Sequence, residues 1–447
     1  MSATEDRTRT ADGYRGVWFA LGQYDGEHGD KYAGGLGTYT AKHVPMAVYD
    51  PAVERTFFTY GGSPPGERSL QVFVGTYDHA RHAVRRPTLV DPKSEPDPGY
   101  DAETVVDPHD DASLALGADG HLWTFVAGRG RRRPGRVYRS AEPHDASAFE
   151  FVAERDHFAY PQPWRVGDGF LVLFTVYDKA GNRELHWART DGRSWPAPRK
   201  LAGVGGHYQV STRRDGTVVT AFNWHPGGDV DRRTNLYVVR TRDGGRTWES
   251  VGGRRVDPPL TDPGNGALVA DYRARDRLVY LSDVALDAAG RPVVLYVTSG
   301  DHAPGPGGDP RRWLVTRWDG RTWRTDEVTT SDHNYDTGCL RVGETWRVLG
   351  PTEPGRRPYH TGGEVAAWRS DDRGATWTRE RRATRGGGGD RHHTYVRRPQ
   401  PAATPFEAFW ADGDPARRSA SRLHVGTLDG SERWTLPRSM AGTWERL

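Results

Sequence analysis

Short apolar runs, each preceded by a turn that contains glycine, recur along the chain. The runs are LWTFVAG after Asp119-Gly120, FLVLFTV after Asp168-Gly169, TVVTAFN after Asp215-Gly216 and RPVVLYV after Gly290. Runs of this length, rich in Val, Phe and Tyr and bounded by turn residues, are typical of β-strands. No segment keeps the helical period of about 3.6 residues over a length that would form a separate domain.

The turn glycines also set a repeat length. Gly120, Gly169 and Gly216 recur roughly every fifty residues, which is about the length of one four-stranded propeller blade. The longer gap before Gly290 indicates an insertion. We therefore predict an all-β fold in which residues 1–447 form a single β-propeller domain with seven four-stranded antiparallel blades. A six-bladed arrangement is the alternative. The predicted blades are 43–90, 109–155, 158–203, 207–256, 265–330, 333–383 and 393–440.

The segment before the first predicted blade has no blade of its own. We expect it to supply a closing strand or to cover the central channel, with residues 1–12 disordered. This stretch is polar and lacks the apolar region of a signal peptide, so a cytoplasmic location is expected, or secretion if a leader precedes this sequence.

A turn motif supports the repeat. Thr241-Arg-Asp-Gly-Gly-Arg-Thr-Trp248 recurs as Ser370-Asp-Asp-Arg-Gly-Ala-Thr-Trp377, and shortened copies end at Trp195 and Trp323. In such a turn, Asp and Ser or Thr hydrogen-bond the backbone, Gly takes the positive φ angle, and Trp packs inward. The motif resembles the Asp-box of sialidase-like propellers.

Charge and composition exclude several classes of function. The chain has 62 Lys and Arg against 59 Asp and Glu, and the two signs are interleaved, so no nucleic-acid partner is expected. No apolar stretch approaches the length of a membrane span, and no membrane partner is expected. Cys339 is the only cysteine, which excludes an intramolecular disulfide. The sequence does not indicate an oligomeric state.

His and Tyr residues begin most of the predicted blades. Since the first strand of each blade lines the central channel, equivalent positions form a ring at one mouth, where a binding site is expected. The predicted ring and its neighbours are His43, His109, Tyr160, His207, Tyr208, His333, Tyr335, His393 and Arg397. Residues that follow the second strands should reach the same face, and these are Arg129, Arg131, Asn223, His225 and Glu353.

These residue types favour one reaction over another. Hydrolysis of a glycosidic bond usually needs a pair of carboxylates, and no obvious pair is present, although Glu353 is a candidate. β-Elimination across a uronic acid needs a base such as His or Tyr, a proton donor, and cations at the carboxylate. No cofactor is required for either reaction. His could bind a structural metal, but no metal-binding spacing supports one.

Seven stretches of the chain carry a resemblance to a known family. They are GDKYAGGLGTYTAKHVPMAVY (29–49), DPHDDASLAL (107–116), GRGRRRPG (128–135), GHYQVS (206–211), AFNWHP (221–226), TSDHNYDTG (330–338) and GPTEPG (350–355). They resemble BNR-repeat proteins of the four-class, and the similarity runs from about Arg15 to Pro437. The resemblance implies a propeller related to ulvan lyases and to rhamnosyl-glucuronate lyases and hydrolases.

The resemblance also implies roles for particular residues. By position, His109, Arg129 or Arg131, and Tyr208 are similar to the centre of the lyases, and His43 is similar to the histidine linked to the related rhamnosidases. The lyases place an arginine sixteen residues after the tyrosine, to neutralise the uronate carboxylate. Here that position is Trp224, so His225 or the Arg129–Arg131 loop would have to replace the arginine.

The leading hypothesis is a lyase that cleaves a uronic-acid-containing oligo- or polysaccharide, such as rhamnose-linked glucuronate. It assigns acid–base roles to His109 and Tyr208, carboxylate binding to Arg129, Arg131 and His225, and pocket shaping to the rest of the ring. One alternative is an α-L-rhamnosidase-like hydrolase with His43 or Glu353 as catalyst. The other is a non-catalytic glycan-binding propeller.

Overall fold

The computed structural model describes residues 10–20, 26–35, 42–62, 70–92, 109, 111–130, 133–385 and 391–447. Among these residues the regular elements are β-strands and four 3₁₀-helices: η3 (Pro226–Gly228), η4 (Val230–Arg232), η5 (Arg273–Arg275) and η6 (Pro306–Gly308). No helix in the described part of the chain is long and apolar enough to span a membrane. Of the predicted disordered segment 1–12, the first nine residues lie outside the described ranges, whereas Thr10 forms a bridge with Thr88.

The strands form successive antiparallel meanders. The first three are β3 (Ala47–Asp50), β4 (Arg55–Gly62), β5 (Gln71–Asp78) and β6 (Ala83–Asp91); β7 (Ala112–Leu116), β8 (Leu122–Val126), β9 (Gly135–Ser140) and β10 (Phe149–Arg155); and β11 (Ala159–Val166), β12 (Gly169–Tyr177), β13 (Arg183–Thr190) and β14 (Arg199–Ala202).

The next two meanders follow the same order. They are β15 (Gln209–Arg214), β16 (Thr217–Trp224), β17 (Thr234–Thr241), β18 (Trp248–Glu249) and β19 (Arg255–Val256), with β20 (Leu268–Ala270) added on β17; and β21 (Leu278–Leu286), β22 (Pro292–Ser299), β23 (Arg311–Trp318) and β24 (Trp323–Ser331). The predicted insertion therefore lies between β19 and β21, and it contains β20 and η5.

The last meanders join the first through the chain termini. They are β25 (Cys339–Arg341), β26 (Trp346–Pro354), β27 (Gly363–Ser370) and β28 (Thr378–Arg382); and β29 (His392–Arg397), β30 (Ala408–Gly413), β31 (Ser419–Gly426) and β32 (Arg433–Thr435). The N-terminal β1 (Gly16–Ala20) pairs with β31, β4 and β2 (Ala33–Gly35), and β33 (Trp444–Arg446) pairs with β6. The expected closing strand is thus β1.

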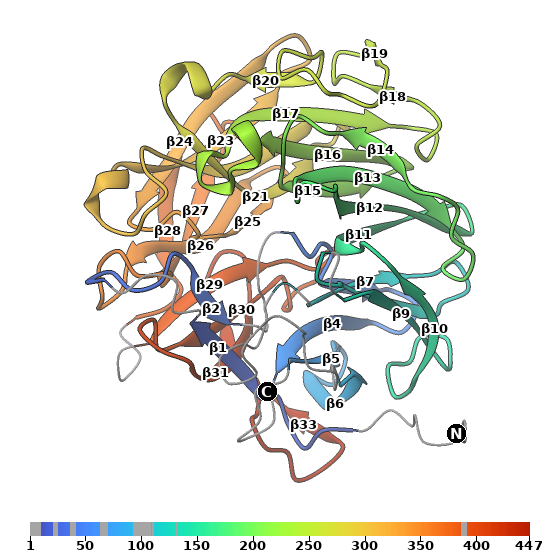
Figure 1. The fold of residues 1–447 in the computed structure, drawn as a ribbon. Coiled ribbons are helices and arrows are strands. Elements are labelled where there is room, and N and C mark those ends of the chain that lie inside the picture. Colours follow the sequence, from blue (N-terminus) through green and yellow to red (C-terminus); the bar gives the residue numbers. More distant parts are fainter. Residues whose placement is uncertain are drawn as a thin grey trace.

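The sheets are arranged around a common centre, as in a propeller. Figure 1 shows β11, β15, β21 and β25 near the centre and β10, β18, β24 and β28 toward the periphery. The first strands of neighbouring sheets contact one another, as β15 contacts β21 and β21 contacts β25. Each predicted blade range overlaps one of these meanders.

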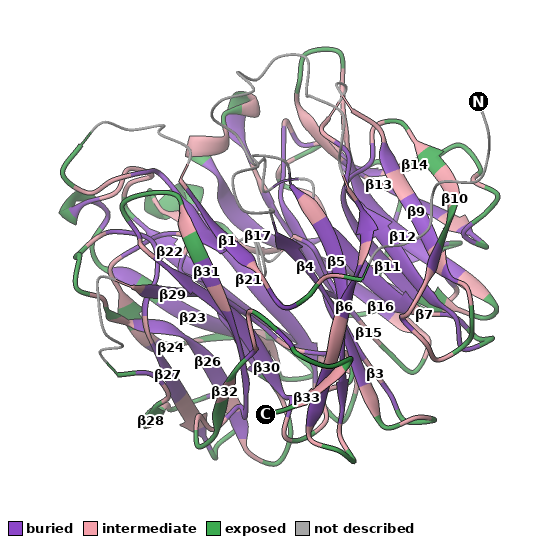
Figure 2. Ribbon diagram, turned by 90° about the horizontal axis from the view of Figure 1, so that it is seen from below, coloured by how far each residue is buried: buried purple, intermediate pink, exposed green. Residues whose placement is uncertain are grey.

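The hydrophobic core lies between neighbouring sheets. One cluster joins Val210 and Val219 of the β15–β16 pair to Val279 and Tyr296 of the β21–β22 pair. Figure 2 shows buried residues along the middle of the strands and exposed residues mainly in the connecting turns. Face-to-face sheet packing buries apolar side chains without a helical layer, which explains how a chain with 35% hydrophobic residues folds.

The four turns singled out in the sequence are hydrogen-bonded as expected. The Asp243 carboxylate accepts bonds from Thr247 N (2.9 Å) and Thr247 Oγ1 (2.7 Å), and Trp248 is buried. Asp372 accepts the same two bonds from Thr376 at 2.9 and 2.7 Å. In the shortened copies, Asp191 accepts from Ser194 N (2.7 Å) and Asp319 from Thr322 N (2.7 Å).

Candidate active site

Two adjoining cavities lie where the first strands of several sheets begin. The outer cavity, about 170 Å³, is lined by Lys31, Tyr32, His109, Arg129, Arg183, Tyr208, Val230, Arg233 and Tyr335. The inner cavity, about 30 Å³, shares Tyr32, Tyr208, Arg233 and Tyr335 and adds Lys42, Tyr160, Tyr280, Leu281, Asn334, Thr337 and Tyr395. The described lining therefore contains three arginines, two lysines and no carboxylate.

Tyr208 lies at the junction of the two cavities, one residue before β15. Its backbone N donates to the Asn223 side-chain carbonyl (2.7 Å), and Asn223 Nδ2 donates to Val279 O (2.9 Å). Asn223 therefore fixes the backbone of Tyr208 against the neighbouring sheet. It was predicted to bind substrate, and the structure places it behind the tyrosine.

Two arginines flank the Tyr208 ring. Arg183 is the first residue of β13 and Arg233 immediately precedes β17; their guanidinium carbons lie 5.2 and 5.1 Å from the ring centroid. Among the described residues, neither arginine forms an ion pair with a carboxylate. Their charges are therefore available to an anionic ligand.

Arg233 is held by an aromatic cage. Its guanidinium lies 4.5 Å from the ring centroid of Tyr280 and 5.1 Å from that of Tyr335, and Nη2 donates to Tyr335 Oη (2.7 Å). Cation–π contacts with desolvated rings stabilise a buried cation without neutralising its charge. The cage fixes the position of Arg233 and leaves its net charge intact.

The arginines change the acid–base chemistry of Tyr208. Burial acts to raise its pKa, but the charges of Arg183 and Arg233, together with a hydrogen bond from Tyr160, bring the pKa below its ordinary value of 10.0. Burial and the adjacent Tyr208 raise the pKa of Tyr160 well above that value. Tyr208 is therefore the more easily ionised member of this pair.

Tyr160 has a strained backbone. Its φ angle is +50°, in the left-handed region that non-glycine residues rarely adopt. Such strain costs of order 1–3 kcal/mol and persists only where the surrounding structure fixes it. Here it points the Tyr160 ring at Tyr208, with the two centroids 5.7 Å apart.

His109 lies on the other side of the outer cavity. Its Nε2 is 3.2 Å from Tyr32 Oη, and its ring centroid is 6.1 Å from that of Tyr160. The Tyr32 ring in turn stacks on Tyr335 at 4.9 Å. A histidine and an ionisable tyrosine thus face one cavity that also holds uncompensated positive charge.

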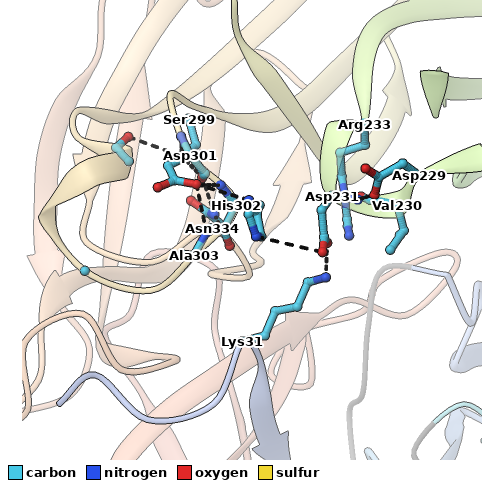
Figure 3. A network of polar contacts seen from close by, with 12 residues as sticks. Lys31, Asp229, Val230, Asp231, Arg233, Ser299, Asp301, His302, Ala303 and Asn334 are labelled. Atoms are coloured by element: carbon cyan, nitrogen blue, oxygen red, sulfur yellow. Dashed lines mark hydrogen bonds and ion pairs between the residues drawn. The ribbon is translucent and has the colours of Figure 1, made fainter. Parts of the chain in front are cut away.

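Two lysines with lowered pKa values lie beside the arginines. Burial, followed by the nearby charge of Arg233, lowers the pKa of Lys31 to about 7. Its Nζ pairs with the Asp231 carboxylate of η4 (Figure 3). Lys42 is fully buried, which lowers its pKa well below 10.5, and its Nζ lies 5.3 Å from the Tyr208 ring centroid.

The structure brings together only part of the predicted set. The cavity lining includes His109, Arg129, Tyr160, Tyr208 and Tyr335. Arg131 lies outside the described residues.

Four predicted histidines lie behind the lining. The His43 ring centroid is 5.6 Å from Tyr160, and that of His225 is 5.0 Å from Tyr208. His207 Nδ1 contacts Arg183 O (3.2 Å), and His333 Nδ1 accepts from Tyr335 N (3.2 Å). Burial lowers the pKa of His207 to about 4 and those of His225 and His333 well below 6.5, so these three rings are neutral supports.

Three predicted residues are not brought to the cavities. Glu353 forms ion pairs with Arg379 (2.6 Å) and Arg382 (2.8 Å) of β28. Arg397 is buried and donates to Gly338 O (3.1 Å). His393 lies beside His424 and accepts from Trp410 Nε1 (3.2 Å). Each of these side chains is occupied by partners within its own sheet or the adjacent one.

One group of described residues has the composition of a metal site. Ligand atoms of His393, Asp412 and His424 lie within 4.8 Å of one another. However, the Asp412 carboxylate already accepts from Arg391 (2.9 Å) and Arg422 (2.6 Å) as well as contacting His424 Nε2 (3.0 Å). The two guanidinium groups supply the positive charge that a metal would bring, so this group is a buried ion-pair network.

Sequence reasoning missed Lys31, Tyr32, Lys42, Arg183 and Arg233. A signal for the arginines was present, because Arg183, Arg233 and Arg311 occupy equivalent positions at the start of the third strand in consecutive sheets. The predicted residues lie on the first strands and at the ends of the second strands, whereas Arg183 and Arg233 lie at the start of the third strands, close to the same cavities.

Comparisons with known proteins agree with this architecture. The model of a family described as "BNR repeat-containing family member" matches residues 71–331. A polysaccharide lyase of family PL25, an ulvan lyase, superposes with a TM-score of 0.71 at 13% identity, covering 94% of this chain and 96% of that chain. The same type of enzyme bound to -[GlcA(1-4)Rha3S]- gives a TM-score of 0.70 at 14% identity, with the same coverage of both chains. No protein of curated description matches the sequence.

Proposed function

We propose, from the premise that this chain belongs to the BNR repeat-containing family, that it is a carbohydrate-active enzyme that cleaves a uronic-acid-containing glycan by β-elimination. The observation that carries the proposal is the pair Arg183 and Arg233, whose guanidinium groups both lie against the Tyr208 ring and, among the described residues, form no ion pair with a carboxylate. The ulvan lyases, whose fold this chain shares, are polysaccharide lyases, and one was solved with a glucuronate-containing ligand.

The proposed reaction uses the cavity residues in separate roles. The Tyr208 phenolate removes the C5 proton of the uronate, and the electron pair forms the C4–C5 double bond as the C4–O4 bond breaks. His109 donates a proton to the glycosidic oxygen O4, which departs with the sugar that it linked to C4. Arg183 and Arg233 bind the carboxylate and stabilise the enolate-like charge that develops on it.

The arginine pair also offers a replacement for the carboxylate-binding arginine that the lyases have at the position of Trp224. The sequence suggested His225 or the Arg129 loop as replacements, but His225 is buried behind Tyr208 with a lowered pKa. In this proposal Arg183 and Arg233 take the carboxylate, and Arg129 supports them from the outer cavity.

The substrate and the number of propeller blades are also part of this proposal. The lack of a carboxylate in the described lining disfavours hydrolysis by a carboxylate pair. The cationic lining favours an acidic sugar, and a glucuronate linked to rhamnose is the substrate we put forward. The seven meanders of the described chain are proposed to be the blades of a seven-bladed propeller.

The test is ultraviolet absorbance together with reducing-end release, measured on gum arabic oligosaccharides and on ulvan. A lyase produces absorbance from the new double bond in proportion to released ends. Tyr208→Phe and His109→Ala should each lower kcat by about 10²–10⁴-fold, while Tyr49→Phe, outside the site, should not. Ends released without absorbance would replace the proposal by hydrolysis, with His43 as the next residue to change. Binding without either signal would indicate a non-catalytic protein.

A further inference from the structure

One carboxylate joins three distant segments across the mouth of the outer cavity. Lys31, from the N-terminal segment 26–35, pairs with Asp231 of η4, and His302 Nε2 lies 3.9 Å from the other oxygen of the same carboxylate (Figure 3). His302 belongs to the connection between β22 and β23. These contacts form a wall on one side of the cavity.

Each side of the wall is fixed to the fold. Asp229 Oδ1 accepts from Asp231 N (2.9 Å), which sets the η4 turn, and Asp301 Oδ1 accepts from His302 N (2.6 Å). The N-terminal segment is tied on its opposite side, because Ala33 N donates to Thr361 Oγ1 (3.0 Å) and Tyr395 Oη donates to Ala33 O (2.8 Å). The segment therefore contacts both β29 and η4.

The space beneath the wall is small. The outer cavity measures about 170 Å³ and contains Arg183, Arg233 and Tyr208. Pockets that enclose a drug-sized ligand measure roughly 300–1,000 Å³, so this cavity lies below that range and suits a short part of a glycan. An enzyme that cuts inside a chain must let the glycan leave the site on both sides. Lys31 and Val230 both line the outer cavity, and the Lys31–Asp231 pair links their two segments on that side.

We propose that the Lys31–Asp231 pair is a specificity determinant that restricts the site to the ends of glycan chains, so that the protein acts in an exo manner. This inference rests on the proposed uronate site and adds its mode of attack. Asp231 is the residue to change, because Lys31 itself lines the cavity. Removing the Asp231 carboxylate frees Lys31 and opens the wall toward η4.

The test measures binding without cleavage, in a Tyr208→Phe background. Size-graded oligomers of β-1,4-linked glucuronic acid are titrated at equal concentrations of sugar repeats and in at least 0.15 M salt, which screens non-specific attraction. If only chain ends bind, affinity per repeat should fall about fivefold from a tetramer to a 20-mer. With Asp231→Ala added, the fall should be less than twofold. Asp257→Ala, an exposed aspartate in a surface ion pair with Arg255, is the control and should match the parent.

Each outcome has a distinct meaning. Affinity per repeat that is independent of length in the parent, or a length dependence that Asp231→Ala leaves unchanged, overturns the wall as a specificity determinant and leaves the uronate site intact. No binding of any length by any variant overturns the uronate site, and the inference with it. In catalytically competent protein, the expected pattern is stepwise shortening of labelled chains, with mid-length fragments appearing early only in Asp231→Ala.

Discussion

Tyr208 and its two arginines show how single residues create the chemistry of this site. A buried tyrosine alone would hold its proton more tightly, because burial disfavours the phenolate. Arg183 and Arg233 reverse that tendency, and Arg233 can do so because three rings hold its guanidinium without neutralising it. The reactive group is therefore produced by the neighbours of Tyr208.

Replacing either arginine should weaken catalysis more than it weakens folding. Arg183→Met and Arg233→Lys should each lower kcat/KM by about 10²–10³-fold, the usual cost of removing one charge-stabilising donor. Arg233→Lys keeps the charge but loses the planar contact with Tyr280 and the bond to Tyr335. Steady-state kinetics against Arg255→Met, a 75% exposed residue, checks this. Equal rates in all three variants would remove the arginines from the mechanism.

The pH profile should follow the Tyr208 phenolate. Because its folded pKa is lowered, the phenolate forms at a lower pH than for a free tyrosine, and the rate should rise with pH through that lowered pKa. Arg183→Gln removes one charge that lowers the pKa, so its rising limb should move to higher pH. Profiles of kcat/KM for the wild type and Arg183→Gln test the shift. Superimposable profiles would assign the limb to another group.

At the scale of elements, the aspartate turns fix where one strand ends and the next begins. In each complete copy, one carboxylate holds the backbone and hydroxyl of a threonine four residues later, while a hydroxyl at the start of the turn accepts from the glycine N. Trp248 then packs between neighbouring sheets. The turn thus couples local hydrogen bonding to the packing of a whole sheet.

Asp372→Ala should lower the free energy of unfolding by about 1–2 kcal/mol, because the carboxylate's four hydrogen bonds, two of them from Thr376, are lost from an exposed turn. The hydrogen bonds lower the pKa of Asp372 to about 2 from 3.8. A lowered pKa means that the stabilisation is present above pH 3.8 and is lost as pH falls toward 2. Urea unfolding at pH 7 and near pH 2 tests both points, with Asp257→Ala as control. A difference that persists near pH 2 would contradict the assignment.

For the whole molecule, the decisive feature is the closure made by β1. This strand pairs with β31 at Trp18↔Ser419 and meets β4 at Gly16↔Gly62, so it joins the last meander to the first. The segment that follows β1 then carries Lys31 and Tyr32 to the mouth of the channel. The same stretch of chain closes the fold and helps to build the site.

Trp18→Ala should therefore be among the most damaging core substitutions. The side chain is fully buried and packs against Gly413, and its loss should cost about 3–5 kcal/mol. Denaturant unfolding measures the change when it is monitored by backbone circular dichroism, a signal that does not depend on the tryptophan removed. Trp434→Ala, at a partly buried position of β32, is the matched control and should cost clearly less. Equal losses of unfolding free energy in the two variants would mean that Trp18 of β1 is not important for closing the fold.

The sequence by itself determined the periodic features of this protein. Turn spacing located the meanders and the four aspartate turns, because both depend on residues close together in the chain. It also brought His109, Tyr160 and Tyr208 to one mouth, because repeated units place equivalent positions in a ring.

Only the tertiary structure determined which charged side chains lie close together. Arg183 and Arg233 come from different sheets, and Lys31 from the closing segment, yet all three line one cavity. Glu353 is paired instead with Arg379 and Arg382 of β28, which lies two strands away in the same sheet. Electrostatic partners are set by distance in space, and a local pattern cannot show which side chain from another sheet will reach a given position.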